Sequence, residues 1–250
     1  MTRYKDRFKH ARTLVCVAAF YATVFSAESQ SNDGQSAKIH ELVSWLLNNN
    51  ESMHGMPFSE VVAATSGKKI IPIDREKDAA ILKQIGAALD IVLTRMNAED
   101  SPVKKAGRIN EASHFFEDAM QEEFDKIPGC KCSFPLTADG KIQRPGYPDL
   151  QLDLPDGRTF YLDPKLFAKG SRTSSFRTFY FEPRSGTNKV NRDACHLIVG
   201  IEHDFAATGR FLNWELVDIS HFQVQLKAEF QGSNRDMYRE EAVVARGETH

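Results

Sequence analysis

The first half of the chain carries apolar residues at the three- and four-residue spacing of amphipathic helices. Residues 39–47 show this spacing over a short stretch, and residues 75–97 show it over a long one. Residues 103–127 repeat the pattern, and Pro128-Gly129 ends it. The sequence therefore predicts helices over these three ranges.

After Gly129 the pattern changes to alternating or short continuous apolar runs, which is typical of β-strands. The predicted strands are 147–154, 159–167, 175–181, 196–201, 214–219 and 222–230. The turn signal Pro155-Asp156-Gly157 joins the first two strands into a hairpin. Helices followed by hairpin-rich strands indicate an α/β (α+β) fold, in which a mixed β-sheet is flanked by helices and further helices lie at the N-terminal end.

The N-terminus has the order of segments found in secretory signal peptides. Basic residues occupy positions 3–12, an apolar run follows over 14–25, and the small residues Ser26 and Ala27 precede a polar stretch. We expect a signal peptide over 1–27, a polar linker over 28–36 and a single domain over 37–250, helical up to 127. Secretion or a periplasmic location follows if the signal is genuine. A misassigned start or a buried N-terminal helix would instead leave the protein in the cytoplasm.

Composition and charge place the chain among ordinary globular proteins. Hydrophobic residues make up 41% and charged residues 26%, and the formal net charge is −2, so no overall basic field points to nucleic acid. Residues 158–192, however, hold eight Lys/Arg against two acidic residues. This stretch could follow a phosphate backbone, or it could be a solvated basic face.

Three cysteines remain once the predicted signal peptide is set aside. They are Cys130, Cys132 and Cys195. An odd number does not make a disulfide framework, although one bridge to Cys195 is possible in an oxidising compartment. The Cys130-x-Cys132 spacing is tighter than that of usual zinc sites.

The chemistry of the chain is concentrated in the predicted hairpin. Asp149 stands near the start of its first strand, and the second strand carries Asp163 and Lys165. Residues two apart on a strand share a face, so Asp163 and Lys165 project together, and the hairpin brings Asp149 across toward them. Two carboxylates and a lysine are the groups that metal-assisted phosphodiester hydrolysis requires. The carboxylates can bind the metal, and the lysine can orient or deprotonate the attacking water.

Pro148-Asp149, followed fourteen residues later by Asp163-x-Lys165, resembles the PD-(D/E)xK nuclease superfamily, which includes many type II restriction endonucleases. The resemblance covers roughly residues 103–180. It implies a restriction-endonuclease-like fold and Mg²⁺-dependent cleavage of double-stranded DNA, with Mn²⁺ as another possible metal. It also implies that Asp149, Asp163 and the carbonyl of Pro164 bind the metal, that Lys165 is catalytic, and that a homodimer would cut both strands. Pro164 departs from the family pattern, and we expect an irregular strand there.

Members of the superfamily often place one more glutamate on the helix before the motif. Helical geometry puts Glu117 at the edge of the apolar face of that helix, whereas Glu111 points toward solvent. Glu117 is therefore the preferred additional catalytic and metal-binding residue, with Glu111 second. Either residue could instead be an ordinary exposed helix charge.

Further residues are candidates for contacts with DNA. Lys169, Arg172 and Arg177 belong to the basic stretch that would lie along the phosphates, and Asn234 and Arg235 have the chemistry to read base edges. His196 and His203 flank a predicted strand and could touch phosphate, although packed or surface histidines are the favoured interpretation.

Several enzyme classes are disfavoured because the sequence lacks their motifs. It has no P-loop, no dinucleotide-binding glycine fingerprint, no HExxH and no GxSxG. Two alternatives to a nuclease stay open at the level of the sequence. One is a non-catalytic nucleic-acid-binding relative of the same fold, and the other is a secreted protein of unrelated function with an accidental motif.

Overall fold

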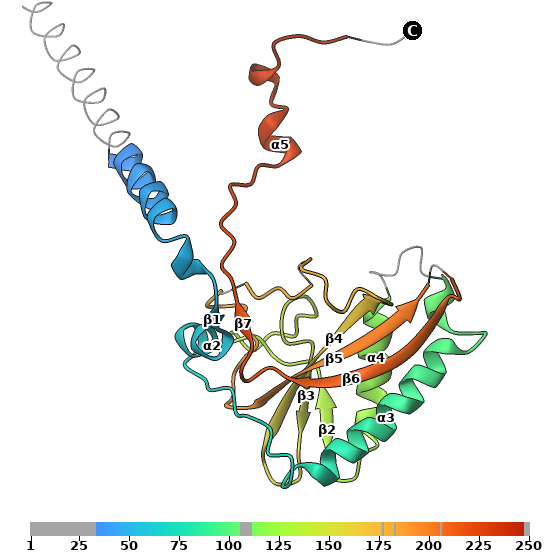
Figure 1. The fold of residues 1–250 in the computed structure, drawn as a ribbon. Coiled ribbons are helices and arrows are strands. Elements are labelled where there is room, and N and C mark those ends of the chain that lie inside the picture. The colour runs from blue at the N-terminus through green and yellow to red at the C-terminus, as the bar shows by residue number, and fades with distance from the viewer. Residues whose placement is uncertain (1–33, 106–111, 177, 183, 206, 248–250) are drawn as a thin grey trace, which may run out of the picture. The chain divides into compact units, whose positions relative to one another are not determined.

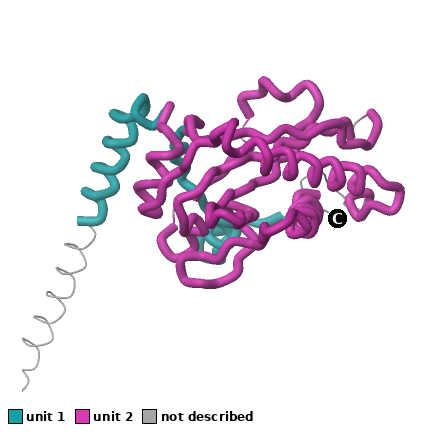
Figure 2. The backbone as a smooth tube through the Cα atoms, turned by 90° about the horizontal axis from the view of Figure 1, so that it is seen from below, with its two compact units in different colours: residues 1–54, 225–250 teal, residues 55–224 magenta. Residues whose placement is uncertain are grey.

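The computed structural model describes the chain except for residues 1–33, 106–111, 177, 183, 206 and 248–250. The predicted signal peptide, Glu111 and Arg177 therefore lie outside the described residues. The chain divides into two compact units, residues 55–224 and residues 1–54 with 225–250, which Figure 2 shows in magenta and teal.

The larger unit is built on a five-stranded mixed sheet (Figure 1). Its strands are β2 (Lys131–Ser133), β3 (Leu150–Asp153), β4 (Thr159–Ala168), β5 (Cys195–Asp204) and β6 (Arg210–Asp218), and they lie side by side in this order. The β4 and β5 strands are parallel, and all the other neighbours are antiparallel. A two-stranded pair, β1 (Met56–Pro57) with β7 (Gln223–Val224), completes the strands of this unit.

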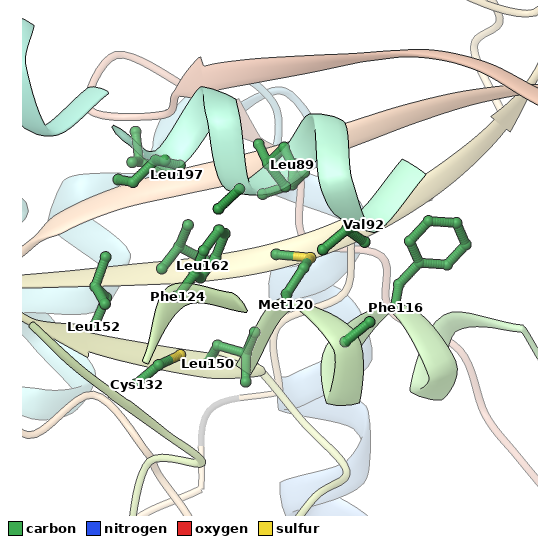
Figure 3. Close-up of a cluster of buried hydrophobic side chains, with 14 of the residues drawn as sticks. Leu89, Val92, Phe116, Met120, Phe124, Cys132, Leu150, Leu152, Leu162 and Leu197 are labelled. Carbon is green, nitrogen blue, oxygen red and sulfur yellow. The ribbon is translucent and has the colours of Figure 1, made fainter. Parts of the chain in front are cut away.

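Two helices cover one face of the sheet. They are α3 (Ala79–Asn97) and α4 (Ser113–Phe124), and their apolar faces meet Leu residues of β3, β4 and β5 in the main core (Figure 3). The close approach of α3 to β6 depends on Gly86, because a Cβ there would lie 3.1 Å from the Trp214 ring. Flanking helices on a mixed sheet confirm the predicted fold class.

A second apolar cluster forms around α2 (Phe58–Ser66). Phe58 and Val62 of this helix pack with Tyr147, Tyr161 and Val190, among others. Tyr161 is two residues before Asp163 on β4, so the second cluster lies on the same sheet face as the predicted catalytic residues. The motif is thus placed on the sheet face opposite the main core.

The smaller unit contains short helical elements. Residues 34–48 are helical, so the helix predicted over 39–47 is present and begins before it. The 3₁₀-helices η1 (Glu51–Met53) and η4 (Glu240–Ala242) and the single-turn α5 (Asn234–Met237) follow along the chain. No helix in the described part of the chain is long and apolar enough to cross a membrane.

The helical predictions from residue 75 onward were too long. The long helix begins at Ala79 rather than at residue 75, because the Asp74 side chain accepts the backbone N–H groups of Glu76 and Lys77 in a preceding turn. Within the range 103–127, the described part contains only α4 and the 3₁₀-helix η2 (Pro102–Lys105).

Two strand predictions were wrong in extent or in kind. The described residues of 175–181 form no strand, since Phe179 packs edge-on against Phe58 instead of joining the sheet. Of the range 222–230, only Gln223–Val224 is a strand. The first hairpin strand also begins later than predicted, at Leu150, which leaves Asp149 just before it.

The expected irregularity at Pro164 is absent. The β4–β5 register runs without a shift from Phe160↔Cys195 to Ala168↔His203, and Pro164 lies opposite Val199. On its other edge β4 pairs with β3 only as far as Leu162. From Asp163 onward that edge has no partner among the described strands, so a residue without an N–H is accommodated there.

Candidate active site

The predicted β-hairpin forms and presents the motif. Leu150 of β3 lies opposite Leu162 of β4, and the turn between the strands contains Gly157 at φ 82°. Asp149 immediately precedes β3, and Asp163 immediately follows Leu162. The register therefore brings the two aspartates together across the hairpin, as the sequence predicted.

Asp163 and Lys165 form a partly buried ion pair. The Lys165 Nζ lies 2.5 Å from Asp163 Oδ2, and the side chains are 30% and 2% exposed. Asp163 Oδ2 accepts no hydrogen bond of regular geometry from any residue that the structure describes. The negative charge of this buried carboxylate is therefore balanced mainly by the Lys165 ammonium group, and its Oδ2 atom can still accept a hydrogen bond.

Asp149 has a strongly perturbed carboxyl group. Burial, followed by the charge of Asp163 and a hydrogen bond with it, raises the pKa of Asp149 to about 8, and Lys165 offsets the rise in part. Two carboxylates this close cannot both ionise without a cation or a proton between them. Asp149 is thus the group that holds a proton near neutral pH in the absence of such a cation.

Glu117 lies beside this pair on α4. Its side chain is buried, its negative charge helps to raise the pKa of Asp149, and it accepts a hydrogen bond of 2.9 Å from Arg144. Arg144 also pairs with Asp118 at 2.8 Å and stacks on the Phe134 ring. Sequence reasoning did not find Arg144, because it stands in an irregular segment before the motif with no periodicity to mark it.

Behind the acids lies a buried aromatic pair. The Tyr147 hydroxyl is 2.6 Å from His196 Nδ1, and both residues are buried. Burial lowers the pKa of His196 to about 3, so the imidazole is neutral. His196 is therefore a packed histidine, whereas His203 is partly exposed beside Phe205.

The residues predicted to contact DNA are spread over both units. Lys169 follows β4 and lies 3.8 Å from Asp204, and Arg172 pairs with Glu215. Asn234 and Arg235 lie on α5 in the smaller unit. Contact of these four residues with DNA stays a prediction.

The cysteines and the histidines do not assemble into a further site. Cys130, Cys132 and Cys195 are free thiols. Within the described ranges, no group of three or more His, Cys, Asp or Glu side chains is gathered in a geometry that could hold a metal ion. This result also covers Asp149, Asp163 and Glu117, so their joint binding of a metal ion stays a prediction.

Comparison with known proteins places the chain in the class of type II restriction enzymes. The chain belongs to the type II restriction enzyme MjaV family, whose sequence profile matches residues 51–241. It is 29% identical over 205 residues to the type II restriction enzyme MjaV of Methanocaldococcus jannaschii. The aligned region covers 75% of this chain and 86% of the relative. Membership of this family excludes a protein of unrelated function, and the catalytic roles of Asp149, Asp163 and Lys165 stay a prediction.

Proposed function

We propose that this restriction enzyme hydrolyses phosphodiester bonds of double-stranded DNA at Asp149, Asp163 and Lys165, in a metal-dependent reaction of the PD-(D/E)xK type. The observation that carries the proposal is the ion pair of 2.5 Å between Lys165 and the buried Asp163, with Asp149 close enough to have its pKa raised by Asp163. This is the set of groups that metal-assisted phosphodiester hydrolysis requires.

The donor set fits Mg²⁺, or Mn²⁺ in its place. Asp149 and Asp163 offer hard carboxylate oxygens, and the repulsion between them favours a cation in the position of the Asp149 proton. The Pro164 carbonyl and Glu117 would complete the ligands. Glu117 accepts a hydrogen bond of 2.9 Å from Arg144 through Oε2, which leaves its other carboxylate oxygen as a potential metal ligand.

The bound metal would supply Lewis acidity to the phosphate group and to the attacking water. Lys165 is 30% exposed, so its ammonium can reach a substrate while Asp163 holds it in place. In this position it orients the attacking water and offsets the charge that develops on the phosphate oxygens. Asp149 has to lose its proton before it can bind a cation.

DNA is expected to lie along the basic segment that follows β4. Lys169, Arg172 and Arg177 would contact phosphates, and Asn234 and Arg235 would approach base edges. Lys169 and Arg172 are 65% and 67% exposed and can exchange their acidic partners for phosphate oxygens. Cleavage of both strands would require two such sites, as in a homodimer.

Plasmid cleavage in Mg²⁺ tests the proposal. Lys165→Ala is expected to lower the cleavage rate by roughly a hundredfold or more. The substitution removes the group that orients the attacking water and offsets the charge on the phosphate oxygens. Lys83→Ala, at an exposed lysine of α3, is the matched control and should retain the wild-type activity. Equal rates for the wild type and Lys165→Ala would refute the assignment.

A further inference from the structure

Lys189 is a buried lysine close to the acidic residues of the proposed site. Its side chain is 1% exposed, and no other lysine in the described part of the chain is buried. The ammonium donates a hydrogen bond of 3.1 Å to the carbonyl oxygen of Arg144. An ammonium group has three donors, and burying it beside one neutral acceptor is unfavourable unless negative charge lies nearby.

The backbone around Lys189 is fixed on both sides. The Asn188 side chain accepts the Val190 N–H at 2.9 Å, and the Asn188 carbonyl accepts the Ala138 N–H at 2.8 Å. On the other side, the Asn191 N–H donates to the Tyr161 hydroxyl at 3.0 Å. Lys189 is therefore held in the interior and does not reach solvent or a bound DNA strand.

Three carboxylates act on this ammonium group. Burial lowers the pKa of Lys189, while the charges of Asp149, Asp163 and Glu117 oppose that effect. These are the three acids of the proposed metal site. Lys165 pairs with Asp163, and Arg144 is shared between Glu117 and Asp118, so two cations face three carboxylates before Lys189 is counted.

We infer that Lys189 is a positioning residue of the proposed metal site, a fixed positive charge that balances the acid cluster and weakens its affinity for divalent cations in the absence of DNA. The inference rests on the proposed function. Lys189 acts through Asp149, Asp163 and Glu117 and does not touch the substrate. Because the fixed charge lowers the affinity of the empty cluster, tight metal binding depends on the additional negative charge of a DNA phosphate.

The test is Mn²⁺ binding to the full-length protein without DNA, measured by titration calorimetry. Lys189→Gln removes the charge and keeps a donor for the Arg144 carbonyl, whereas Lys189→Met removes both, and Lys189→Arg keeps the charge. Removal of one charge several ångströms away is expected to tighten Mn²⁺ binding about tenfold in Lys189→Gln and Lys189→Met. Lys189→Arg and Lys83→Gln, a control at an exposed lysine of α3, should bind like the wild type.

Other outcomes separate the charge from a structural role. Wild-type affinity in Lys189→Gln with a change only in Lys189→Met would assign Lys189 to the hydrogen bond and overturn the inference. If both variants fail to fold, Lys189→Met combined with Glu117→Gln removes one charge of each sign. Recovery of a cooperative thermal transition in this double variant supports the charge balance, and no recovery overturns it.

A further variant distinguishes this inference from the proposed function. Asp149→Asn alone should abolish or strongly weaken Mn²⁺ binding, because it removes a proposed ligand. If Asp149→Asn binds Mn²⁺ like the wild type, the metal site itself is wrong, whatever the Lys189 variants show. If Asp149→Asn loses binding and Lys189→Gln is unchanged, the site stands and the role of Lys189 is refuted.

Discussion

The two aspartates of the site are compensated in different ways. Asp163 is 2% exposed and has the Lys165 ammonium at 2.5 Å, whereas the structure shows no ion pair between Asp149 and a described cation. Asp149 instead has its pKa raised to about 8, through burial and then through Asp163. In the proposed function, a divalent cation would take the place of the Asp149 proton, and metal binding would release that proton.

Asp149 should make the stability of the metal-free protein depend on pH. The pKa of Asp149 is about 8 in the folded protein against an ordinary value of 3.8, so the protonated carboxyl favours the folded state. This contribution is complete below the unfolded pKa and is lost as the pH rises through the folded pKa of about 8.

We expect the melting temperature of the metal-free wild type to fall by several degrees more than that of Asp149→Asn between about pH 5 and about pH 9. Asp100→Asn, which changes an exposed aspartate, is the matched control and should follow the wild type. Parallel melting curves for the wild type and Asp149→Asn would contradict the raised pKa.

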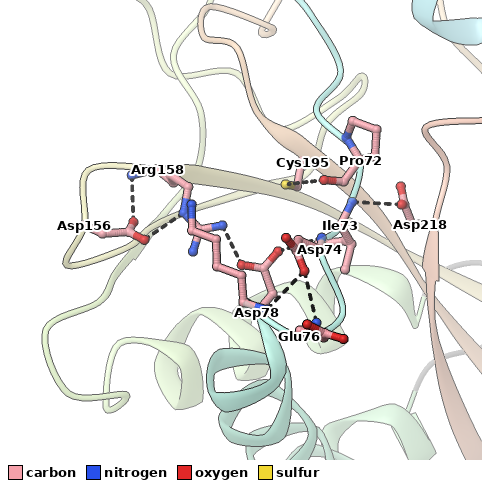
Figure 4. A network of polar contacts seen from close by, with 10 residues as sticks. Pro72, Ile73, Asp74, Glu76, Asp78, Asp156, Arg158, Cys195 and Asp218 are labelled. Carbon is pink, nitrogen blue, oxygen red and sulfur yellow. Dashed lines mark hydrogen bonds and ion pairs between the residues drawn. The ribbon is translucent and has the colours of Figure 1, made fainter.

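At the scale of secondary structure, the hairpin that carries the motif is tied to the start of α3. Arg158, which follows the turn, lies 2.5 Å from Asp78 and 2.7 Å from Asp156 (Figure 4). Asp78 is 1% exposed and also accepts the Asp74 N–H. This contact joins the turn of the hairpin to the helix that covers the sheet, at a distance in sequence of 80 residues.

Arg158→Met should destabilise the protein because it leaves the carboxylate of Asp78 buried without its cation. We expect a loss of about 2–3 kcal/mol in the free energy of unfolding. This loss is no larger than the smallest values typical of a broken buried ion pair, because Arg158 is partly exposed. Denaturant unfolding measures the change. Asp156→Ala, which removes only the exposed partner, should cost less than about 1 kcal/mol. A similar loss in both variants would show that the buried Arg158–Asp78 ion pair stabilises the protein no more than the exposed Arg158–Asp156 pair.

The sequence predicted the elements that have a regular hydrophobic pattern. The β4 strand matches its prediction closely, and the position of Asp163 relative to Asp149 followed from the strand period and the turn at Gly157. Residues 175–181 are also rich in aromatic residues, which favoured a strand. The β4 and β5 strands are parallel, so the segment between them has to cross over, and Phe179 packs on the second cluster.

The parts of the site that the sequence did not reveal lie in irregular segments. Arg144 and Lys189 follow no helical or strand period, and only tertiary packing brings them to the acids. Glu117 could be placed at the edge of a helix face from the sequence alone. Its partner Arg144, 27 residues away, could not.

At the scale of the whole molecule, charge has to act locally. The net charge of −2 provides no overall attraction for DNA, so binding depends on basic groups gathered near the site. Lys169 and Arg172 follow β4 directly, and their acidic partners, Asp204 and Glu215, belong to β5 and β6. Exposed pairs of this kind contribute little to stability, so the two cations are available to phosphates.

The double variant Lys169→Ala/Arg172→Ala should therefore weaken the binding of a labelled DNA duplex without unfolding the protein. Loss of two phosphate contacts is expected to reduce the slope of log affinity against log salt by about 1.8, as followed by fluorescence anisotropy in metal-free buffer. Lys83→Ala/Lys104→Ala removes the same charge from exposed positions on α3 and η2 and is the matched control. If both double variants reduce the slope equally, the total charge of the protein determines DNA binding and the position of the basic residues does not. If the control keeps the wild-type slope, the segment after β4 is where the enzyme holds the phosphates.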